Sequence, residues 1–261
     1  MEAVAVHTTT ELHLLEAACR VVAGTFEVVA KYIEPGRETR ELDQIAEDYI
    51  RSQGAEPAFK GYRVGNLVYP YTLCISVNDA VVHGLPGPYR LQEGDIVSID
   101  CGCKKDGYYG DAAYTFAVGE ISEEKQRLLA VTEAALWKGI AQAVSRNKVY
   151  HISRAIQEYV EAHGFSVVRE LVGHGIGRRL HDDPPIPNFV PPLLHRSQFP
   201  NVKLRAGQAL AIEPMVNAGA PDVKTDPDGW TIRTVDGKPS AHFEHTVVVQ
   251  DKEPLVLTLW T

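Results

Sequence analysis

Buried acidic residues are the feature that most restricts how this chain can fold. Four carboxylates and one histidine lie far apart, each in a short apolar or glycine-rich segment: Asp100 in VSIDCG, Asp111 in YYGDAAYTF, His174 in LVGHGIGR, Glu213 in ALAIEPM and Glu244 in AHFEHTVVV. An ionised carboxylate is costly to bury unless a cation or hydrogen-bond donors meet it. The segments around the four carboxylates contain no Lys or Arg. If these residues converge, two divalent cations would balance their charge, so we predict a metal centre.

Length, charge and composition exclude several classes of protein. The 261 residues suit one domain, residues 1–261, long enough to contain two closely fused halves. A net charge of −8 argues against a direct nucleic-acid role, because phosphate binding needs a concentrated basic surface. The N-terminus shows no secretion signal, and no apolar run is long enough to cross a bilayer. The four cysteines form no C-x-x-C pair, so we expect reduced thiols and a cytoplasmic protein without a membrane role.

The periodicity of apolar residues predicts four helices in two pairs. The first pair covers about residues 10–33 and 39–53, and Gly54 stands where a C-cap glycine belongs. The second pair covers about residues 122–144 and 150–163, followed by Gly164. The second and fourth helices match at a constant offset of 110 residues, which also aligns the two glycines. We therefore expect two similar halves, about residues 8–119 and 120–252, with a site at their junction.

Strands are predicted to follow each helix pair. In the first half they cover residues 73–77, 95–103 and 108–118. In the second half they cover residues 209–213, 230–234 and 242–250. Residues 183–200 are rich in proline, and we expect an extended surface loop there.

A hairpin can bring two of the carboxylates together. Asp100 and Asp111 flank the turn signal at residues 104–107, and a two-residue loop at either 105–106 or 106–107 sets both on one face of the sheet. The first register places them directly opposite, with Cβ atoms about 4.5–5.5 Å apart. Cys101 and Cys103 then point to the other face. Taken alone, the pair is equally compatible with two unrelated surface aspartates at the ends of a turn.

The ligand types narrow the chemistry. His174 is flanked by glycines, which allow the close backbone approach needed to aim a side chain. Carboxylate oxygens with one imidazole and no thiolate suit Mn, Fe(II), Co or Zn in a two-metal centre. Two such ions share a water and lower its pKa, which makes a nucleophile for hydrolysis. The chain has no G-x-S-x-G elbow, no cysteine in a catalytic frame and no G-x-G-x-x-G fingerprint.

At these residues the chain is similar to the type I methionine aminopeptidases, which are pita-bread metallopeptidases. The similarity spans almost the whole chain and is carried by the segments CISVNDAVVHGLP, GDIVSIDCG, DGYYGDAAYTF, GHGIGRRLHDDPPIPN, LRAGQALAIEPM, DGWTIRT and AHFEHTVVV. It implies an α/β fold of the α+β type, in which two pseudo-symmetric halves form an antiparallel sheet covered by two helix pairs. It also implies a metallo-exopeptidase that removes the initiator methionine from nascent proteins when the second residue is small.

The resemblance implies a role for each candidate ligand. Asp111 and Glu244 would bridge two divalent ions. Asp100 would complete the shell of the second ion, while His174 and Glu213 would bind the first. A metal-bridged hydroxide would attack the scissile carbonyl, with Glu213 as proton acceptor.

Further residues match the substrate site of the family. His83 and His181 match histidines that bind no metal but hydrogen-bond the substrate and stabilise charge on the scissile carbonyl oxygen. Sulfur and aromatic groups suit a thioether side chain, and the methionine pocket would comprise Tyr62, Tyr69, Cys74 and Trp230. Substrate would be the N-terminal Met of nascent polypeptides, with the ribosome a candidate partner, and we expect a monomer.

Three departures from the family pattern change the expected shape of this pocket, not the metal chemistry. Phe59 stands where many relatives have Cys, Leu180 where they often have Phe, and residues 63–68 make a longer segment. Two alternative functions remain. A related dinuclear peptidase that cleaves before proline usually carries a large extra N-terminal domain. A non-catalytic pita-bread protein that binds partners usually lacks ligands that are present here.

Overall fold

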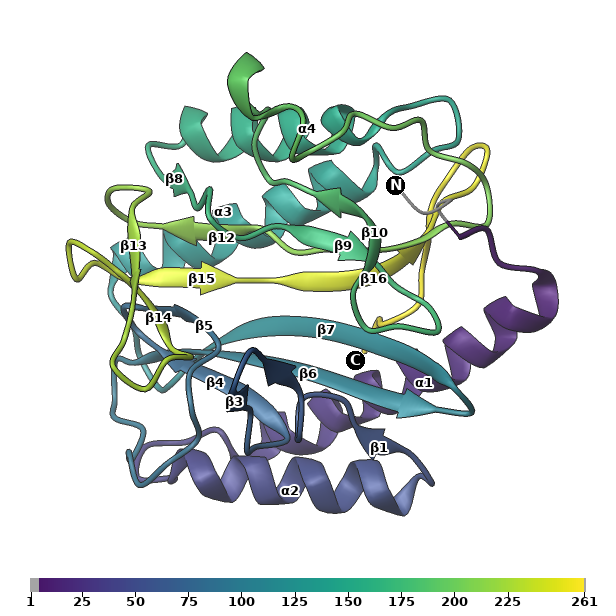
Figure 1. Cartoon of the computed structure of the whole chain (residues 1–261). Helices are drawn as coiled ribbons and strands as arrows, with labels where there is room; N and C mark the ends of the chain where they lie inside the picture. Colours follow the sequence, from purple (N-terminus) through teal and green to yellow (C-terminus); the bar gives the residue numbers. More distant parts are fainter. Residues whose placement is uncertain (1–4, 261) are drawn as a thin grey trace.

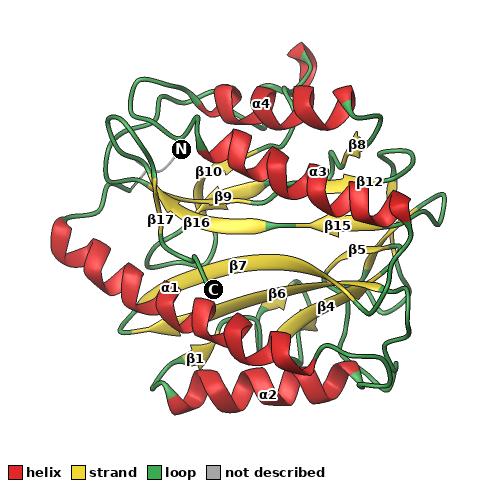
Figure 2. Cartoon of the chain, turned by 180° about the vertical axis from the view of Figure 1, so that it is seen from behind, coloured by secondary structure: helices red, strands yellow, loops and turns green. Residues whose placement is uncertain are grey.

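The computed structural model describes residues 5–260 as strands backed by two pairs of helices. One pair lies at the lower edge of Figure 1 and the other at the upper edge. Seen from behind, α1 and α3 lie across the strands while α2 and α4 lie further out (Figure 2). Helices therefore cover one side of the strands, and loops surround the other.

The first helix pair is α1 (Thr9–Val29) and α2 (Thr39–Ser52). Thr8 and Glu11 form a capping box that satisfies backbone donors at the start of α1. The last predicted turn of this helix is instead a 3-10 helix, η1 (Ala30–Tyr32). Gly54 follows α2 with a φ of 67°, the left-handed conformation expected after a helix end.

The second pair is α3 (Glu123–Ile140) and α4 (Val149–Ala162). Ser122 caps α3 as expected, since its hydroxyl accepts a hydrogen bond from the N–H of Lys125. Helix α3 ends before residue 144, because Val144 forms a β-bridge with Gln250 instead of continuing the helix. Both predicted pairs are otherwise confirmed, with shifts of a few residues at their ends.

The main sheet has nine strands, and its pairings are antiparallel. Its central path runs in the order β1 (Glu56–Pro57), β6 (Ile96–Lys105), β7 (Tyr108–Ala117), β16 (Glu244–Val248), β11 (Ala209–Ile212), β9 (Gly173–Gly175) and β10 (Asp182–Ile186). Off this path, β4 (Leu73–Val77) pairs with β6 and β17 (Leu255–Val256) with β16. Strands from both parts of the chain thus meet where β7 pairs with β16.

Three small sheets surround the main one. The first joins β15 (Ser240–His242), β12 (Met215–Asn217) and β8 (Ser166–Val167). The second joins β13 (Val223–Thr225), β14 (Ile232–Thr234) and β5 (Ala80–Val82). The third is a short hairpin of β2 (Arg63–Val64) and β3 (Leu67–Val68). The single strand predicted at residues 242–250 is interrupted at Phe243, whose N–H bonds to the carbonyl of Pro214.

Two hydrophobic cores lie under the two helix pairs. Phe26, Leu42 and Ile99 belong to the core beneath α1 and α2, and Leu136 and Ile156 to the core beneath α3 and α4. The helices and the antiparallel sheet confirm the expected α+β class. The division into pseudo-symmetric halves at about residue 120 stays a prediction.

The prediction of a surface loop at residues 183–200 is partly wrong. Residues up to Ile186 belong to strand β10, and Ile186, Asn188 and Phe189 are buried. Only the later part, around the 3-10 helix η2 (Leu193–His195), lies on the surface. The prolines led to the wrong prediction of a loop, because an edge strand of a sheet tolerates residues that lack an N–H. Among residues 5–260, no helix has the length and hydropathy to span a membrane.

Candidate metal centre

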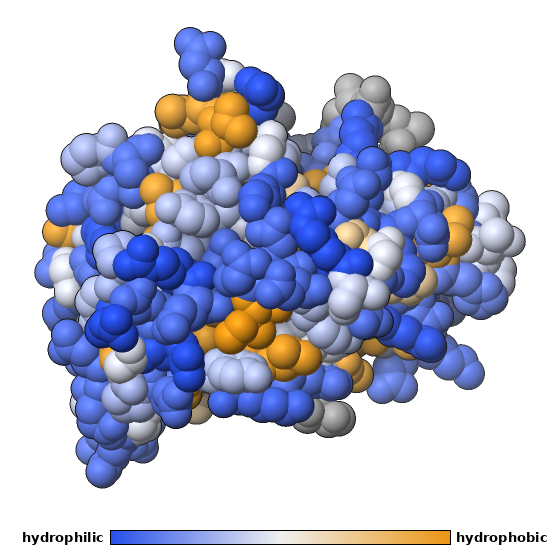
Figure 3. Space-filling model, turned by 90° about the horizontal axis from the view of Figure 1, so that it is seen from below, coloured by the Kyte–Doolittle hydropathy of each residue, from blue (hydrophilic) through white to orange (hydrophobic). Residues whose placement is uncertain are grey.

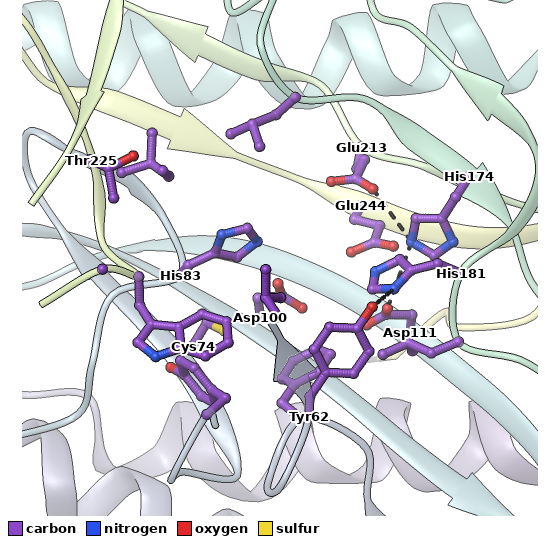
Figure 4. A pocket seen from close by; sticks show the side chains of 18 residues that line it. Tyr62, Cys74, His83, Asp100, Asp111, His174, His181, Glu213, Thr225 and Glu244 are labelled. Atoms are coloured by element: carbon purple, nitrogen blue, oxygen red, sulfur yellow. Dashed lines mark hydrogen bonds and ion pairs between the residues drawn. The ribbon is translucent and has the colours of Figure 1, made fainter. Parts of the chain in front are cut away.

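All five candidate ligands line one cavity of about 380 Å³ (Figure 4). Asp100 and Asp111 come from β6 and β7, and Glu244 from the start of β16. His174 lies on β9 and Glu213 directly follows β11. The cavity thus collects side chains from the β6–β7 hairpin and from three later segments of the chain, all of which are neighbours in the sheet.

Strand register aligns three of the carboxylates. Ala113 on β7 pairs with Asp100 on one side and with Glu244 on the other. Directly paired residues share a face of the sheet, and Asp111 shares it too because it precedes Ala113 by two positions. Cys101 and Cys103 point to the opposite face, into the core beneath α1. The sheet therefore separates acidic groups on one face from apolar groups on the other.

The hairpin adopts the second of the two registers considered from the sequence. Lys105 pairs with Tyr108, so the loop is Asp106-Gly107, and both loop residues have positive φ, as type I′ turns require. Gly102, not Asp100, stands directly opposite Asp111. The two aspartates share a face, as predicted, but sit diagonally.

His174 presents one ring nitrogen to the acidic groups. Its Nδ1 lies 2.9 Å from the carbonyl oxygen of Gly175, which can only accept, so Nδ1 carries the proton. Nε2 is left as an acceptor and lies 3.6 Å from Oε1 of Glu213 and 4.0 Å from Oδ2 of Asp111. This is the tautomer that a metal-binding histidine needs.

Glycines on both sides of His174 are required by close backbone packing. A Cβ on Gly173 would lie 2.4 Å from the carbonyl oxygen of Ala211, and one on Gly175 would lie 2.2 Å from that of Asp183. Only glycine lets strand β9 approach its neighbours this closely. The close approach expected from the sequence is thus present at both positions.

Three buried carboxylate oxygens fit a cation better than any protein partner. Oδ1 of Asp100, Oδ1 of Asp111 and Oε1 of Glu244 are buried without a hydrogen-bond partner among residues 5–260. Ligand atoms of Asp111, His174 and Glu244 lie within 4.8 Å of one another, a spacing that one ion can span. Oxygen and imidazole donors without a thiolate suit divalent Mn, Fe, Co or Zn. The residues present therefore fit the metal centre that the sequence predicts.

In the absence of a cation, burial disfavours the ionised form of these carboxyl groups. It raises the pKa of Asp100 to about 7 and that of Glu213 to about 8. Burial, reinforced by neighbouring carboxylates, raises the pKa of Asp111 and of Glu244 well above the usual range. Burial also lowers the pKa of His174 to about 3, so its ring is neutral at pH 7.

Two further histidines face the cavity. His83 follows β5 in a left-handed conformation, with φ 58°, and burial lowers its pKa to about 4. The Nδ1 of His181 lies 2.8 Å from the hydroxyl of Tyr62, and the His181 ring packs edge-on against His174 (Figure 4). Both rings are therefore positioned beside the acidic cluster and are neutral at pH 7.

An apolar cluster forms another wall of the cavity. Phe59, Tyr69, Cys74 and Leu180 are buried together, and the ring of Trp230 packs edge-on against Tyr69. The Tyr69 hydroxyl donates hydrogen bonds within the buried region, to the carbonyls of Leu73 and Gly84, which fixes its ring. All four predicted pocket residues and both positions that depart from the family pattern thus line this cavity.

Several cavity residues were not proposed as site residues from the sequence. The wall also includes Leu171, Thr225, Gly229, Ile232 and, from the segment 63–68 that was expected to change the pocket, Val64. Their place in the wall depends on how loops from separate sheets meet. His242, next to Glu213, was also missed. Its spacing of two residues from Glu244 in a strand-like segment was a usable signal for a shared face.

The chain matches the model of metallopeptidase family M24 over residues 13–251. It is 51% identical to the methionine aminopeptidase of Clostridium perfringens (strain 13 / Type A), with 95% of this chain and 96% of that protein covered. The crystal structure of methionine aminopeptidase from Thermotoga maritima superposes with a TM-score of 0.92 at 42% identity, covering 98% and 99% of the two chains. The prolidase from Pyrococcus furiosus shares the fold, with a TM-score of 0.76 at 21% identity, and this chain covers 65% of it.

Proposed function

This chain belongs to metallopeptidase family M24, and from that premise we propose how its cavity acts as an active site. It has the pita-bread fold and is a methionine aminopeptidase, a hydrolase that removes an N-terminal methionine from its substrates. The observation that carries the assignment of the site is the convergence of four carboxylates and the free Nε2 of His174 in one cavity.

Two divalent ions, of Co, Mn, Fe(II) or Zn, would occupy this centre. Asp111 and Glu244 would help to hold both ions, because both side chains are buried and each has a buried oxygen with no partner in the described chain. Asp100 would bind the second ion, and His174 with Glu213 would bind the first. When bound, such ions polarise the scissile carbonyl and lower the pKa of the attacking water.

The protein's own groups would handle protons and charge. Glu213 would be the proton acceptor for the attacking water, because its carboxylate lies beside His174 and burial raises its pKa, which makes the deprotonated form a stronger base. His83 and His181, neutral at pH 7, hydrogen-bond the substrate and stabilise the charge that develops on the carbonyl oxygen. The contact of Tyr62 with Nδ1 fixes which nitrogen of His181 faces the cavity.

The apolar wall would bind the methionine side chain. Phe59, Tyr69, Cys74 and Trp230 offer aromatic faces and a sulfur, which suit a thioether. Phe59 packs closely over Gly102, where a Cβ would lie 2.7 Å from the Phe59 ring. The glycine on β6 thus leaves room for the Phe59 ring, which is larger than the Cys that many relatives have at this position.

The experiment that tests this proposal is hydrolysis of a Met-Gly peptide by purified protein. Activity should disappear after chelation and return with one or more divalent ions, and elemental analysis before and after should show about two ions per chain. Turnover that survives complete removal of metal contradicts the metal centre. No turnover with any ion favours a partner-binding protein.

The cellular setting is part of the proposal. We place the protein in the cytoplasm as a monomer that acts on nascent chains near the ribosome. Its four cysteines are free and buried, as a reducing compartment allows. Sedimentation of the purified protein would test the monomer, and co-sedimentation with translating ribosomes, compared with empty ones, would test the partner.

A further inference from the structure

A buried histidine beside Glu213 has no hydrogen-bond partner in the part of the chain that the structure describes. His242 ends strand β15, its side chain is enclosed, and neither ring nitrogen is paired. Its Nε2 lies 3.5 Å from Oε2 of Glu213. Leaving a buried polar group unpaired costs about 1–3 kcal/mol. We therefore infer the role of His242 from the carboxylate that it faces, which is that of Glu213.

The backbone holds both residues in place. Thr115 Oγ1 accepts a hydrogen bond from the N–H of His242 at 2.9 Å and donates one to its carbonyl at 2.8 Å. The side-chain amide of Asn188 donates to the carbonyl of Glu213 at 3.0 Å. With both main chains fixed, the remaining freedom lies in the rotation of the Glu213 carboxylate.

The two oxygens of that carboxylate face different neighbours. Oε1 lies 3.6 Å from Nε2 of His174, among the proposed metal ligands. Oε2 faces His242. A neutral imidazole ring carries a single N–H. A donor on Oε2 would stop the carboxylate from rotating away from the centre.

We propose that His242 is a positioning residue, whose Nε2–H donates to Oε2 of Glu213 and so holds Oε1 toward the metal ligands. The inference rests on the proposed function of Glu213. Groups that orient a metal-binding side chain in this way are typically worth about 10–100-fold in metal affinity or activity.

The first test compares two substitutions at this position. His242→Gln keeps an N–H donor of similar reach, whereas His242→Leu removes it. Calorimetric titration of metal-free protein with Mn²⁺ should give a Kd for His242→Leu about 10–100-fold weaker than wild type, with His242→Gln close to wild type. Under saturating metal, kcat should fall for the Leu variant while KM changes little, because the methionine pocket is untouched.

A matched control is available three residues along the chain. His245 is also buried, but its Nδ1 contacts the hydroxyl of Thr258 and its ring packs against Trp137, away from the cavity. His245→Gln should leave the Mn²⁺ affinity unchanged. A similar loss of affinity in this control would show that any change in this segment disturbs the site, and would overturn the specific role of His242.

The second test uses wild-type protein and needs no activity, so it distinguishes failure of this inference from failure of the proposed function. Nitrogen-15 NMR of metal-free protein at pH 9, where the Glu213 carboxyl group is ionised and can only accept, should show His242 protonated at Nε2, with an N–H resonance that shifts in the Glu213→Gln variant. Protonation at Nδ1, or a resonance that does not respond, overturns the proposal even if His242→Leu fails to fold. Equal Mn²⁺ affinity in the folded Leu and wild-type proteins overturns it as well.

Discussion

Loading the metal-free protein with divalent ions should release protons. Without a cation, burial favours the protonated form of the four cavity carboxyl groups. Metal ligands must be deprotonated, so each bound ion displaces protons from the groups that hold it. His174 contributes none, because its pKa of about 3 leaves it neutral at pH 7.

The expected number follows from the pKa values. At pH 7, Asp100 with a pKa of about 7 is about half protonated, and Glu213 with a pKa of about 8 is about nine-tenths protonated. Burial and neighbouring carboxylates raise the pKa values of Asp111 and Glu244 well above the usual range, so these two groups add to the release. The coupled cluster as a whole should release more than about one proton at pH 7. At pH 9 the release should be smaller by about one, because Asp100 and Glu213 have already ionised.

Isothermal titration with Mn²⁺ in buffers of different ionisation enthalpy measures this release directly. The apparent Kd should also tighten as pH rises, because the unfavourable displacement of protons becomes easier. The Asp111→Asn variant should release about one proton fewer, whereas Asp48→Asn, an exposed change on α2, should behave as wild type. Release of less than about one proton at pH 7, with a Kd that does not depend on pH, would refute the reasoning, because the carboxyl groups would then be ionised before metal binds.

Four other predictions follow from the geometry of the site. Asp111→Asn should abolish peptide hydrolysis and reduce metal content by elemental analysis, and full activity would contradict its bridging role. His83→Ala should keep the metals but slow kcat by about 10²–10³-fold, so a loss of metal would exclude an accessory role. Val64→Asp, at the half-exposed mouth of the cavity, should raise KM by about fivefold because an apolar contact with the substrate is lost. An unchanged KM would show that the β2–β3 hairpin does not contact the substrate. Gly173→Ala should cost about 1–3 kcal/mol in denaturant unfolding because its Cβ meets the carbonyl oxygen of Ala211, and wild-type stability would show that β9 can move.

The Val64 prediction draws on the surface of the molecule. Val64, Leu67 and Val68 of the hairpin are exposed apolar side chains. Leu67 also packs over Gly229, where a Cβ would lie 2.8 Å from it, so the hairpin is tied to the loop that carries Trp230. Figure 3 shows a largely hydrophilic face interrupted by small hydrophobic patches. An unfolded peptide entering the cavity would pass this rim.

Local patterns were enough to select the candidate metal ligands that share one cavity, and to predict most of the secondary structure. A carboxylate between apolar neighbours must be buried and must find compensation, whatever the fold, so Asp111 and Glu244 were recognisable from their own segments. The helices were predictable for a similar reason, since apolar periodicity and caps such as Ser122 act within one or two turns. The glycines beside His174 likewise predicted close packing of the backbone, and strand β9 shows this packing against its neighbours.

Features that depend on how separate segments meet were decided only by the tertiary structure. The sequence allowed two hairpin registers, and the structure has the one with the Asp106-Gly107 turn, in which Asp100 sits diagonal to Asp111. The role proposed for His242 could be inferred only from the tertiary structure, in which β15 places this residue beside Glu213. Burial and charge preference are properties of single residues and their neighbours, whereas distance between strands is set by the whole sheet, and no local pattern encodes it.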